Sequence, residues 1–381
     1  MNSGKQGVYF QNLDGLRGIA ALAVVLFHAA NWFEYANTAF SRVLYQVLSF
    51  NSLGGELGVL FFFILSGFLI TYLMFEETSK KGSISIGNFY MRRVLRIWPL
   101  YYLSVFVGFM LFPVLVSHHS LPASQNSNIL MYLGFAANFD HILSGSPSNG
   151  MLGVQWSVAV EEQYYLLWPL FFYAFGKSRF FPAFIGISVF LSEYYFSQSS
   201  SGAVRYFHFF SNFRFLAFGA FLAWIAYFHT GKIEARFAKC SPLVLTLIYV
   251  TGLLLLFFHK PLSSISLYLS YILHFVPILF FGFVILEQNF SKNSAFKISK
   301  VPVLTWLGKI SYGMYLIHMI GIYFVLALFP RGTDYYLLKI LFSIILTIFI
   351  SHLSYNFLES HFLKLKSRFS STKTHLNKQT Q

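Results

Sequence analysis

Charged residues, and acidic ones above all, are scarce in this sequence. Only 10% of the 381 residues are charged, 56% are hydrophobic, and Asp and Glu together number 13. This composition excludes an ordinary soluble domain. The excess of 27 basic over 13 acidic residues therefore indicates membrane topology first and an anionic ligand second, and it argues against nucleic acid as a partner. The single cysteine, Cys240, excludes an intramolecular disulfide.

Two further patterns are missing. The first eleven residues lack the basic start, short apolar core and small-residue cleavage site of a signal peptide, so we expect the first hydrophobic run to be retained. No repeat or half-to-half symmetry of the kind found in many transporters is visible.

Long hydrophobic runs are abundant instead. About 20 helical residues cross the hydrocarbon core of a bilayer, and runs of that length predict an all-α bundle of about ten transmembrane spans that contacts membrane lipid. The expected spans are residues 13–33, 54–75, 97–116, 154–175, 180–196, 207–228, 242–258, 264–286, 303–329 and 335–357.

The positions of Lys and Arg predict the orientation of the bundle. With a cytoplasmic N-terminus, 19 of these residues fall in cytoplasmic segments, four in external segments and four within spans. This bias predicts that both termini are cytoplasmic. We expect residues 1–366 to form one transmembrane domain and the polar residues 367–381 to form a disordered cytoplasmic tail. In the long external loop, residues 128–139 are too short to span and either re-enter the membrane or lie at its surface.

The first hydrophobic run carries an arginine and a histidine eleven positions apart, Arg17 and His28. On a helix this spacing is about 20° more than three turns, so both side chains share a face, about 16 Å apart along the axis. Ionisable groups inside a membrane are costly and are candidates for function. The competing interpretation places Arg17 at the interface and makes His28 a packing residue. Asp14 either orients Arg17 or is an acid favoured at a helix N-terminus.

An imidazole can accept a proton from a hydroxyl or carry an acyl group, whereas a guanidinium stays protonated. We therefore assign the chemistry to His28 and anion binding to Arg17. In the second run, the pair Ser66 and Gly67 favours close helix approach; a nucleophilic Ser66 is the other interpretation, although no base is adjacent in sequence.

Three arginines lie within five residues before the third span. Arg93 and Arg96 are three positions apart and share a helix face at the expected cytoplasmic mouth. Guanidinium pairs bind phosphate well, so this pair suits an anionic cofactor. The excess of basic residues at the cytoplasmic ends of membrane spans explains a single arginine here, but it explains three arginines less well.

The fourth run contains Trp156 and the adjacent acids Glu161 and Glu162. Neighbours on a helix point about 100° apart, so at most one carboxylate faces His28. We choose Glu161, which would orient the imidazole as the acid of a catalytic triad does.

The ninth run carries Tyr312, Tyr315 and His318 at intervals of three, and they can line one polar seam. His318 is equally a packing or a catalytic residue on this pattern. No His or Cys spacing in the sequence indicates a metal site.

These motifs, in this order, resemble the acyltransferase-3 family of integral-membrane acyltransferases over nearly the whole chain. The residues that carry the resemblance are Asp14 with the Arg17–His28 spacing, the segment 62–68, the pair Arg93 and Arg96 with 97–101, Trp156 to Glu161 with Tyr164 and Tyr165, the segment 311–318 and the closing 355–359. Tyr164 stands where phenylalanine is commoner in the family.

The resemblance implies transfer of an acyl group, usually acetyl from acetyl-CoA, to a hydroxyl of an extracytoplasmic or lipid-linked carbohydrate such as O-antigen, peptidoglycan or exopolysaccharide. It implies a protein of the bacterial inner membrane and, from the short C-terminal tail, a member of the stand-alone type. CoA would lie against Arg93 and Arg96, with Arg17 near its acyl end. A secondary transporter or flippase that uses the same Arg, His and Glu as a relay is the alternative.

Overall fold

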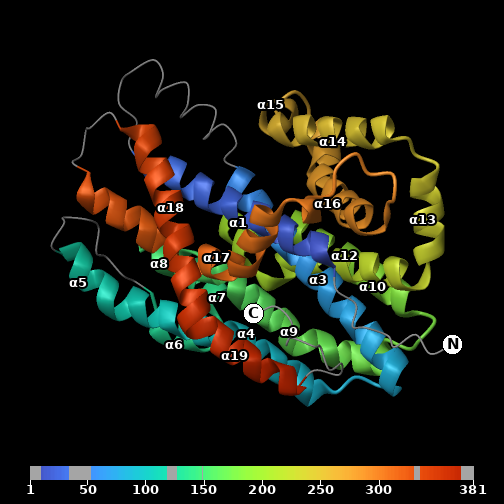
Figure 1. The fold of residues 1–381 in the computed structure, drawn as a ribbon, viewed down its shortest axis with the longest axis horizontal. Helices are drawn as coiled ribbons and strands as arrows, with labels where there is room; N and C mark the ends of the chain where they lie inside the picture. The colour runs from blue at the N-terminus through green and yellow to red at the C-terminus, as the bar shows by residue number, and fades with distance from the viewer. Residues whose placement is uncertain (1–9, 34–52, 118–126, 148, 330–334, 370–381) are drawn as a thin grey trace.

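The computed structural model describes residues 10–33, 53–117, 127–147, 149–329 and 335–369, and every regular element in these ranges is a helix. The longer helices, drawn in Figure 1, are α1 (Gln11–Trp32), α3 (Leu53–Lys81), α4 (Ile86–Phe106), α9 (Gln155–Phe175), α10 (Phe181–Gln198), α12 (Phe209–Phe228), α14 (Pro242–Phe257), α16 (Leu267–Phe290), α17 (Pro302–Leu328) and α18 (Tyr336–Ser354). The shorter ones are η1 (Val107–Leu111), α5 (Phe112–Ser117), α6 (Ile129–Leu133), α7 (Ala137–Ser144), α8 (Gly150–Gly153), α11 (Gly202–Phe207), α13 (Thr230–Ala238), α15 (His259–Ser263), η2 (Ile298–Lys300), η3 (Tyr355–Glu359), α19 (Ser360–Lys366) and η4 (Ser367–Phe369).

Seven helical segments in the described ranges are long and apolar enough to cross a membrane, or eight if α13 and α14, which meet at a bend of 100°, form one broken span. The chain is therefore an integral membrane protein. All ten runs predicted from the sequence fall on helices. However, α9 and α10 are not among these seven, and α14 has only 16 residues. The count of ten spans and the cytoplasmic location of both termini stay predictions.

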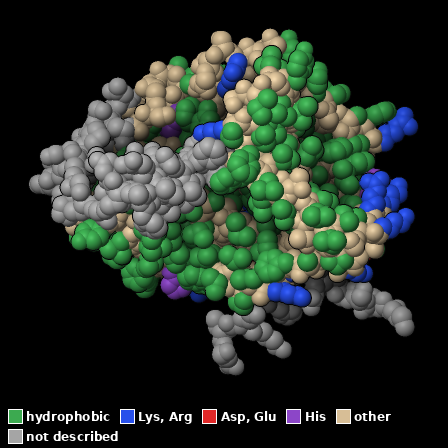
Figure 2. Space-filling model, turned by 90° about the horizontal axis from the view of Figure 1, so that it is seen from above, with side chains coloured by type: hydrophobic (Ala, Val, Ile, Leu, Met, Phe, Trp, Pro, Cys, Tyr) green, Lys and Arg blue, Asp and Glu red, His purple; other side chains and the backbone are tan. Residues whose placement is uncertain are grey.

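The outer surface of the bundle is apolar, as a protein in lipid requires. On α18, for example, Leu338, Leu341, Ile345 and Phe349 are all exposed. Figure 2 shows many hydrophobic side chains on one face, with several basic side chains at its right-hand edge. Such exposed apolar faces suit contact with lipid.

Helices cross closely in the centre of the bundle, where α1 packs against α3, α17 and α18, and α12 packs against α3. A Cβ atom on Gly308 would lie 1.8 Å from the carbonyl oxygen of Asp14, and one on Gly67 would lie 1.9 Å from that of Leu216. Small residues permit such backbone contact between membrane helices. The structure thus confirms the close-approach interpretation for Gly67.

Replacing Gly67 with alanine is expected to destabilise the bundle, because the atom in the way belongs to the α12 backbone and cannot rotate aside. Overpacking of this kind costs about 1–3 kcal/mol. Thermal unfolding of the detergent-purified variant measures the effect. Gly186→Ala on α10 is the matched control, because open space surrounds Gly186; equal melting temperatures for the two variants would contradict the expected crossing.

For residues 128–139 the sequence predicts either re-entry into the membrane or a position at its surface, and in the structure they form α6 and the start of α7. The chain reverses at Phe135, the one described non-glycine residue with positive φ, at 53°. The ring of Phe135 stacks on Tyr101 with centroids 4.4 Å apart, and its carbonyl accepts a hydrogen bond of 2.9 Å from Gln163 Nε2. The segment is therefore packed against α4 and α9, and its depth in the membrane stays a prediction.

The C-terminal helices return along α4. The π-helical turn η3 connects α18 to α19, which packs against α4. Arg92 on α4 pairs with Glu77 at 3.1 Å and donates a hydrogen bond of 2.8 Å to the Phe369 carbonyl. Residues 367–369 of the expected tail therefore form a docked turn, and residues 370–381 lie outside the described ranges.

Candidate active site

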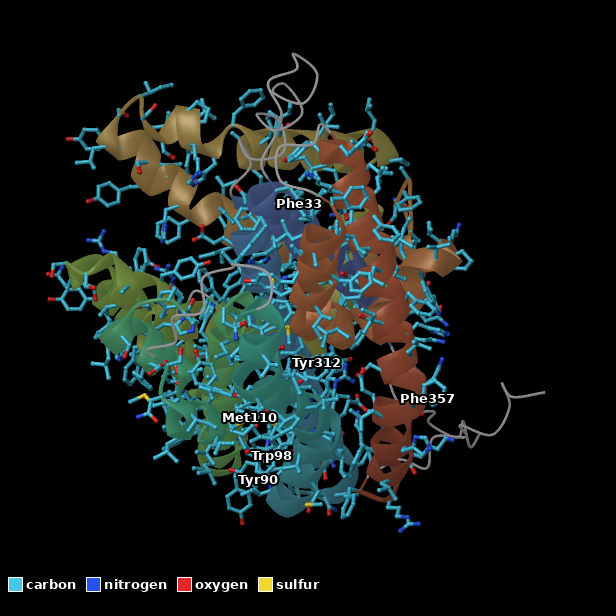
Figure 3. All side chains as sticks on the ribbon, turned by 90° about the vertical axis from the view of Figure 1, so that its left-hand side faces the viewer. Phe33, Tyr90, Trp98, Met110, Tyr312 and Phe357 are labelled. Atoms are coloured by element: carbon cyan, nitrogen blue, oxygen red, sulfur yellow. The ribbon has the colours of Figure 1, made fainter. Side chains whose placement is uncertain are left out.

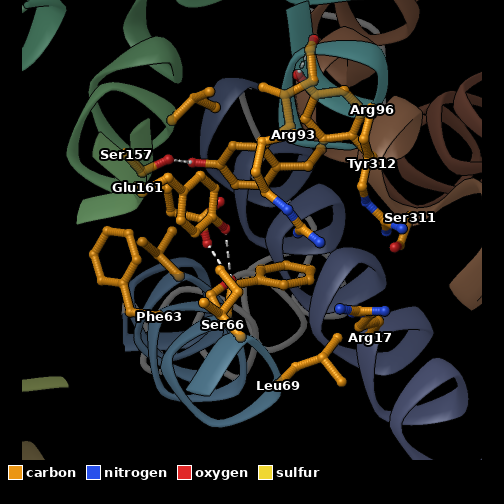
Figure 4. Close-up of a pocket in the computed structure, with 17 residues that line it drawn as sticks. Arg17, Phe63, Ser66, Leu69, Arg93, Arg96, Ser157, Glu161, Ser311 and Tyr312 are labelled. Carbon is orange, nitrogen blue, oxygen red and sulfur yellow. Dashed lines mark hydrogen bonds between the residues drawn. The ribbon is translucent and has the colours of Figure 1, made fainter. Parts of the chain in front are cut away.

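A cavity lies at mid-depth between α1, α3, α4, α9 and α17 (Figure 4). In Figure 3, Tyr312, one of its lining residues, lies below Phe33 and above Tyr90. The space between its walls, open solvent at its mouth included, is about 750 Å³. Its lining residues are Arg17, Val59, Phe62, Phe63, Ser66, Leu69, Ile70, Arg93, Arg96, Ile97, Ser157, Val158, Glu161, Tyr165, Ser311, Tyr312 and Tyr315.

Three arginines from two helices converge on this cavity, as Figure 4 shows for Arg17, Arg93 and Arg96. Arg17 Nη1 lies 3.4 Å from Asp14 Oδ1, so Asp14 does contact Arg17. The guanidinium of Arg93 lies 5.7 Å from the ring centroids of Phe89 and Tyr165, and its buried Nε has no hydrogen-bond partner among the described residues. Buried donors without partners are costly, so this end of the cavity is suited to an anion.

The carboxylates of Glu161 and Glu162 point in different directions, as expected of helix neighbours. Glu161 Oε1 accepts a hydrogen bond of 2.6 Å from Ser66 Oγ inside the cavity, and Tyr165 donates one of 3.2 Å to Ser66. Glu162 Oε2 accepts a bond of 3.0 Å from Trp98 Nε1. Ser66 thus has a carboxylate partner that its sequence neighbourhood did not supply.

His28 lies beyond the other end of the cavity, next to His318. Its Nδ1 is 3.0 Å from the Val24 carbonyl and 3.2 Å from His318 Nε2, while His318 Nδ1 is 2.7 Å from the Tyr315 carbonyl. In the described ranges, His28 has no contact with Glu161, whose partner is Ser66. The expected Glu161–His28 pair is therefore not formed here, and His318 has the position proposed for Glu161.

The hydrogen-bond network assigns the tautomers of the two histidines. Backbone carbonyls only accept, so Nδ1 carries the proton in both rings. The single proton on His28 Nδ1 is then shared between the Val24 carbonyl and His318 Nε2, and the lone pair of His28 Nε2 stays free of partners among the described residues. Because His28 is only half-buried, this nitrogen is available as a base or nucleophile.

Other residues singled out in the sequence have supporting positions. Tyr312 lines the cavity and donates a hydrogen bond of 2.8 Å to the Ile97 carbonyl, which ties α17 to α4. Trp156 lies outside the lining and packs on Phe63, with ring centroids 6.1 Å apart. No group of three His, Cys, Asp or Glu side chains in the described parts of the chain is arranged to hold a metal ion.

Two polar lining residues of α9, Ser157 and Tyr165, received no role from the sequence. Ser157, Glu161 and Tyr165 recur every four residues on α9 and so share a helix face. That period around Glu161 is the signal that could have identified them. Tyr315 belongs to the seam predicted on α17, and its hydroxyl bonds to Ser157 across the helix interface.

Comparison with known proteins identifies the family. The model of the acyltransferase-3 family, described as an acyltransferase domain, matches residues 10–355. The chain belongs to this family. Within it, a putative O-acetyltransferase of Staphylococcus aureus is 28% identical over 379 residues, which covers 93% of this chain and 58% of that protein. The family motifs Arg17, His28, Arg93 and Arg96 thus lie in or beside one cavity.

Two further members of the family match a shorter region. A putative peptidoglycan O-acetyltransferase of Bacillus subtilis is 34% identical over 43% of this chain and 24% of its own length. A peptidoglycan O-acetyltransferase of Listeria monocytogenes is 30% identical over 44% of this chain and 25% of its own length. The chain therefore spans at most about 58% of these relatives. No solved structure matches it.

Proposed function

We propose that the protein is an O-acyltransferase of the bacterial inner membrane that moves an acyl group, acetyl above all, from cytoplasmic acyl-CoA to a hydroxyl of an extracytoplasmic or lipid-linked carbohydrate. The observation that carries this proposal is the cavity itself. It has three arginines in its lining, and beyond the opposite end lies His28, whose Nε2 has no hydrogen-bond partner among the residues that the structure describes. A donor with an anionic head and a reactive acyl end matches that order.

Phosphate chemistry supports acyl-CoA as the donor. The cavity lining contains three arginines against one acidic side chain, Glu161. Guanidinium groups form paired, charge-assisted hydrogen bonds with phosphate oxygens. Arg93 and Arg96 would bind the phosphates at the mouth that the charge bias predicts to be cytoplasmic. Arg17 would stabilise the oxyanion or hold an oxygen of the pantetheine arm.

His28 would perform the transfer. In the direct route, His28 Nε2 takes the proton of the acceptor hydroxyl as its oxygen attacks the thioester carbonyl; the C–S bond breaks, and the CoA sulfur leaves with that proton. In the covalent route, Nε2 itself attacks the carbonyl and CoA leaves as the thiolate; the acceptor oxygen then displaces the imidazole, and the proton of the hydroxyl neutralises the thiolate. Both routes need the lone pair that the tautomer assignment leaves on Nε2.

The relatives support a carbohydrate acceptor. Those from Bacillus and Listeria are named as peptidoglycan O-acetyltransferases, putative in the Bacillus case, so a cell-wall or surface glycan is the acceptor class we propose. A hydroxyl of such a glycan would approach His28 from the outer side, opposite the arginines.

Labelled acetyl-CoA tests the proposal. Membranes that contain the protein are incubated with acetyl-CoA labelled in the acetyl group and a panel of peptidoglycan, O-antigen and exopolysaccharide acceptors. We expect base-labile label on a glycan, and none with membranes that lack the protein. Glycan movement across the membrane without any acetyl ester would instead support the transporter alternative and overturn the proposal.

A further inference from the structure

Tyr315 lines the cavity and packs against the histidine pair. Its side chain is 7% exposed, and its ring centroid lies 6.4 Å from that of His318. His318 in turn is hydrogen-bonded to His28 at 3.2 Å. The ring of Tyr315 thus forms part of the cavity wall on the side of the two histidines.

The ring of Tyr315 is held in place at its tip and along its edge. The hydroxyl bonds to Ser157 Oγ and donates to the Val154 carbonyl, 3.3 Å away, so α17 is tied to α9 across the cavity. Phe62 of α3 packs edge-on against the ring, with centroids 6.0 Å apart. The ring is thus fixed by two helices besides its own.

The cavity wall near Tyr315 is apolar. Val59, Phe62 and Phe63 line it on α3, and Val158 lines it on α9. The three arginines and Glu161 are the charged residues of the lining, and none of them is a contact of the Tyr315 ring. An acyl thioester has its phosphates and its acyl chain at opposite ends, so phosphates at the arginines would direct the acyl chain toward Tyr315.

We propose that Tyr315, held by Ser157, sets the length of the acyl group that the protein transfers. The inference rests on the proposed function and deepens it. With the ring in place, an acetyl group can lie between the apolar wall and the ring with its carbonyl directed toward His28. A longer chain needs the volume that the ring occupies. Since cores tolerate overpacking poorly, butyryl and longer chains are excluded.

The test compares acetyl-, butyryl- and hexanoyl-CoA as donors for wild-type protein and for Tyr315→Ala and Tyr315→Leu, with label measured on the acceptor. We expect the ratio of butyryl to acetyl transfer to rise at least tenfold in Tyr315→Ala and by a smaller factor in Tyr315→Leu. Tyr315→Phe, which keeps the ring, should leave the ratio within about twofold. Size-exclusion profiles show which variants are folded. One folded variant of the two, Tyr315→Ala or Tyr315→Leu, is enough for the test.

Tyr323→Ala is the matched control, because Tyr323 lies on the same helix and packs on Trp32 and Phe112 outside the cavity lining. The ratio of butyryl to acetyl transfer in Tyr323→Ala should equal that of the wild type. An unchanged ratio in a folded Tyr315→Ala or Tyr315→Leu variant that still transfers acetyl would overturn the inference. Wild-type protein that transfers no acyl group would instead refute the proposed function.

Discussion

Replacement of His28 with alanine should reduce acyl transfer to the level of membranes that lack the protein. The imidazole Nε2 is the free nitrogen of the His28–His318 pair, because backbone carbonyls hold the proton of both rings at Nδ1. General base catalysis by a positioned imidazole contributes about 10²–10⁴-fold, and a covalent acyl carrier would contribute more. The loss should appear in kcat, with little change in donor binding.

Two variants separate chemistry from packing at this position. His352→Ala removes a histidine of α18 whose ring is hydrogen-bonded to Asn356 at 2.9 Å. This variant should retain wild-type transfer. His318→Gln should keep His28 in place but shift the pH profile of kcat, because His318 Nε2 accepts from His28 Nδ1. Full glycan acetylation by folded His28→Ala protein would exclude both catalytic routes.

A single-turnover experiment distinguishes the two routes. When labelled acetyl-CoA is supplied without acceptor, the covalent route predicts label on the protein that is absent in His28→Ala. The direct route predicts no protein-bound label and a strict need for acceptor before CoA is released.

Helix periodicity alone predicts much of this site. The eleven-residue spacing predicts that Arg17 and His28 share a face of one helix, and in the structure Arg17 lines the cavity while His28 contacts His318. The 100° rotation between neighbours predicts that at most one of Glu161 and Glu162 faces His28; in the structure the two carboxylates bond to Ser66 and Trp98. Both predictions concern residues on one helix, where backbone geometry fixes the answer before any packing occurs.

Contacts between helices could not be predicted in the same way. Ser66 and Glu161 are 95 residues apart, and their contact depends on how far α3 and α9 slide along one another. The position of α3 in turn depends on crossings such as Gly67 against the Leu216 backbone of α12, which exist only in the packed bundle. The expected contact between Glu161 and His28 is not formed for this reason. The analogy with a catalytic triad suggests which residue types could pair, but the packing of the helices makes His318 the partner of His28.

Neutralising Arg93 should weaken donor binding far more than it slows the chemical step. Hydrogen bonds to charged groups contribute about 1.5–3 kcal/mol, so Arg93→Gln should raise the KM for acetyl-CoA about 10- to 100-fold. Its buried Nε has no partner among the described residues, and aromatic rings rather than a carboxylate flank the guanidinium. The substitution therefore removes few interactions within the protein, and its main effect should be on the binding of acetyl-CoA.

A donor without phosphates tests whether Arg93 acts by binding the phosphates of acetyl-CoA. S-acetyl-pantetheine carries the same thioester on the same arm, so its KM should be almost unaffected by Arg93→Gln if the guanidinium binds phosphate. Arg179→Gln removes an exposed arginine outside the cavity lining, and both donors should behave as in the wild type. If Arg93→Gln raised the two KM values equally, Arg93 would be acting on the pantetheine arm or on the shape of the cavity, because only the phosphates distinguish the two donors.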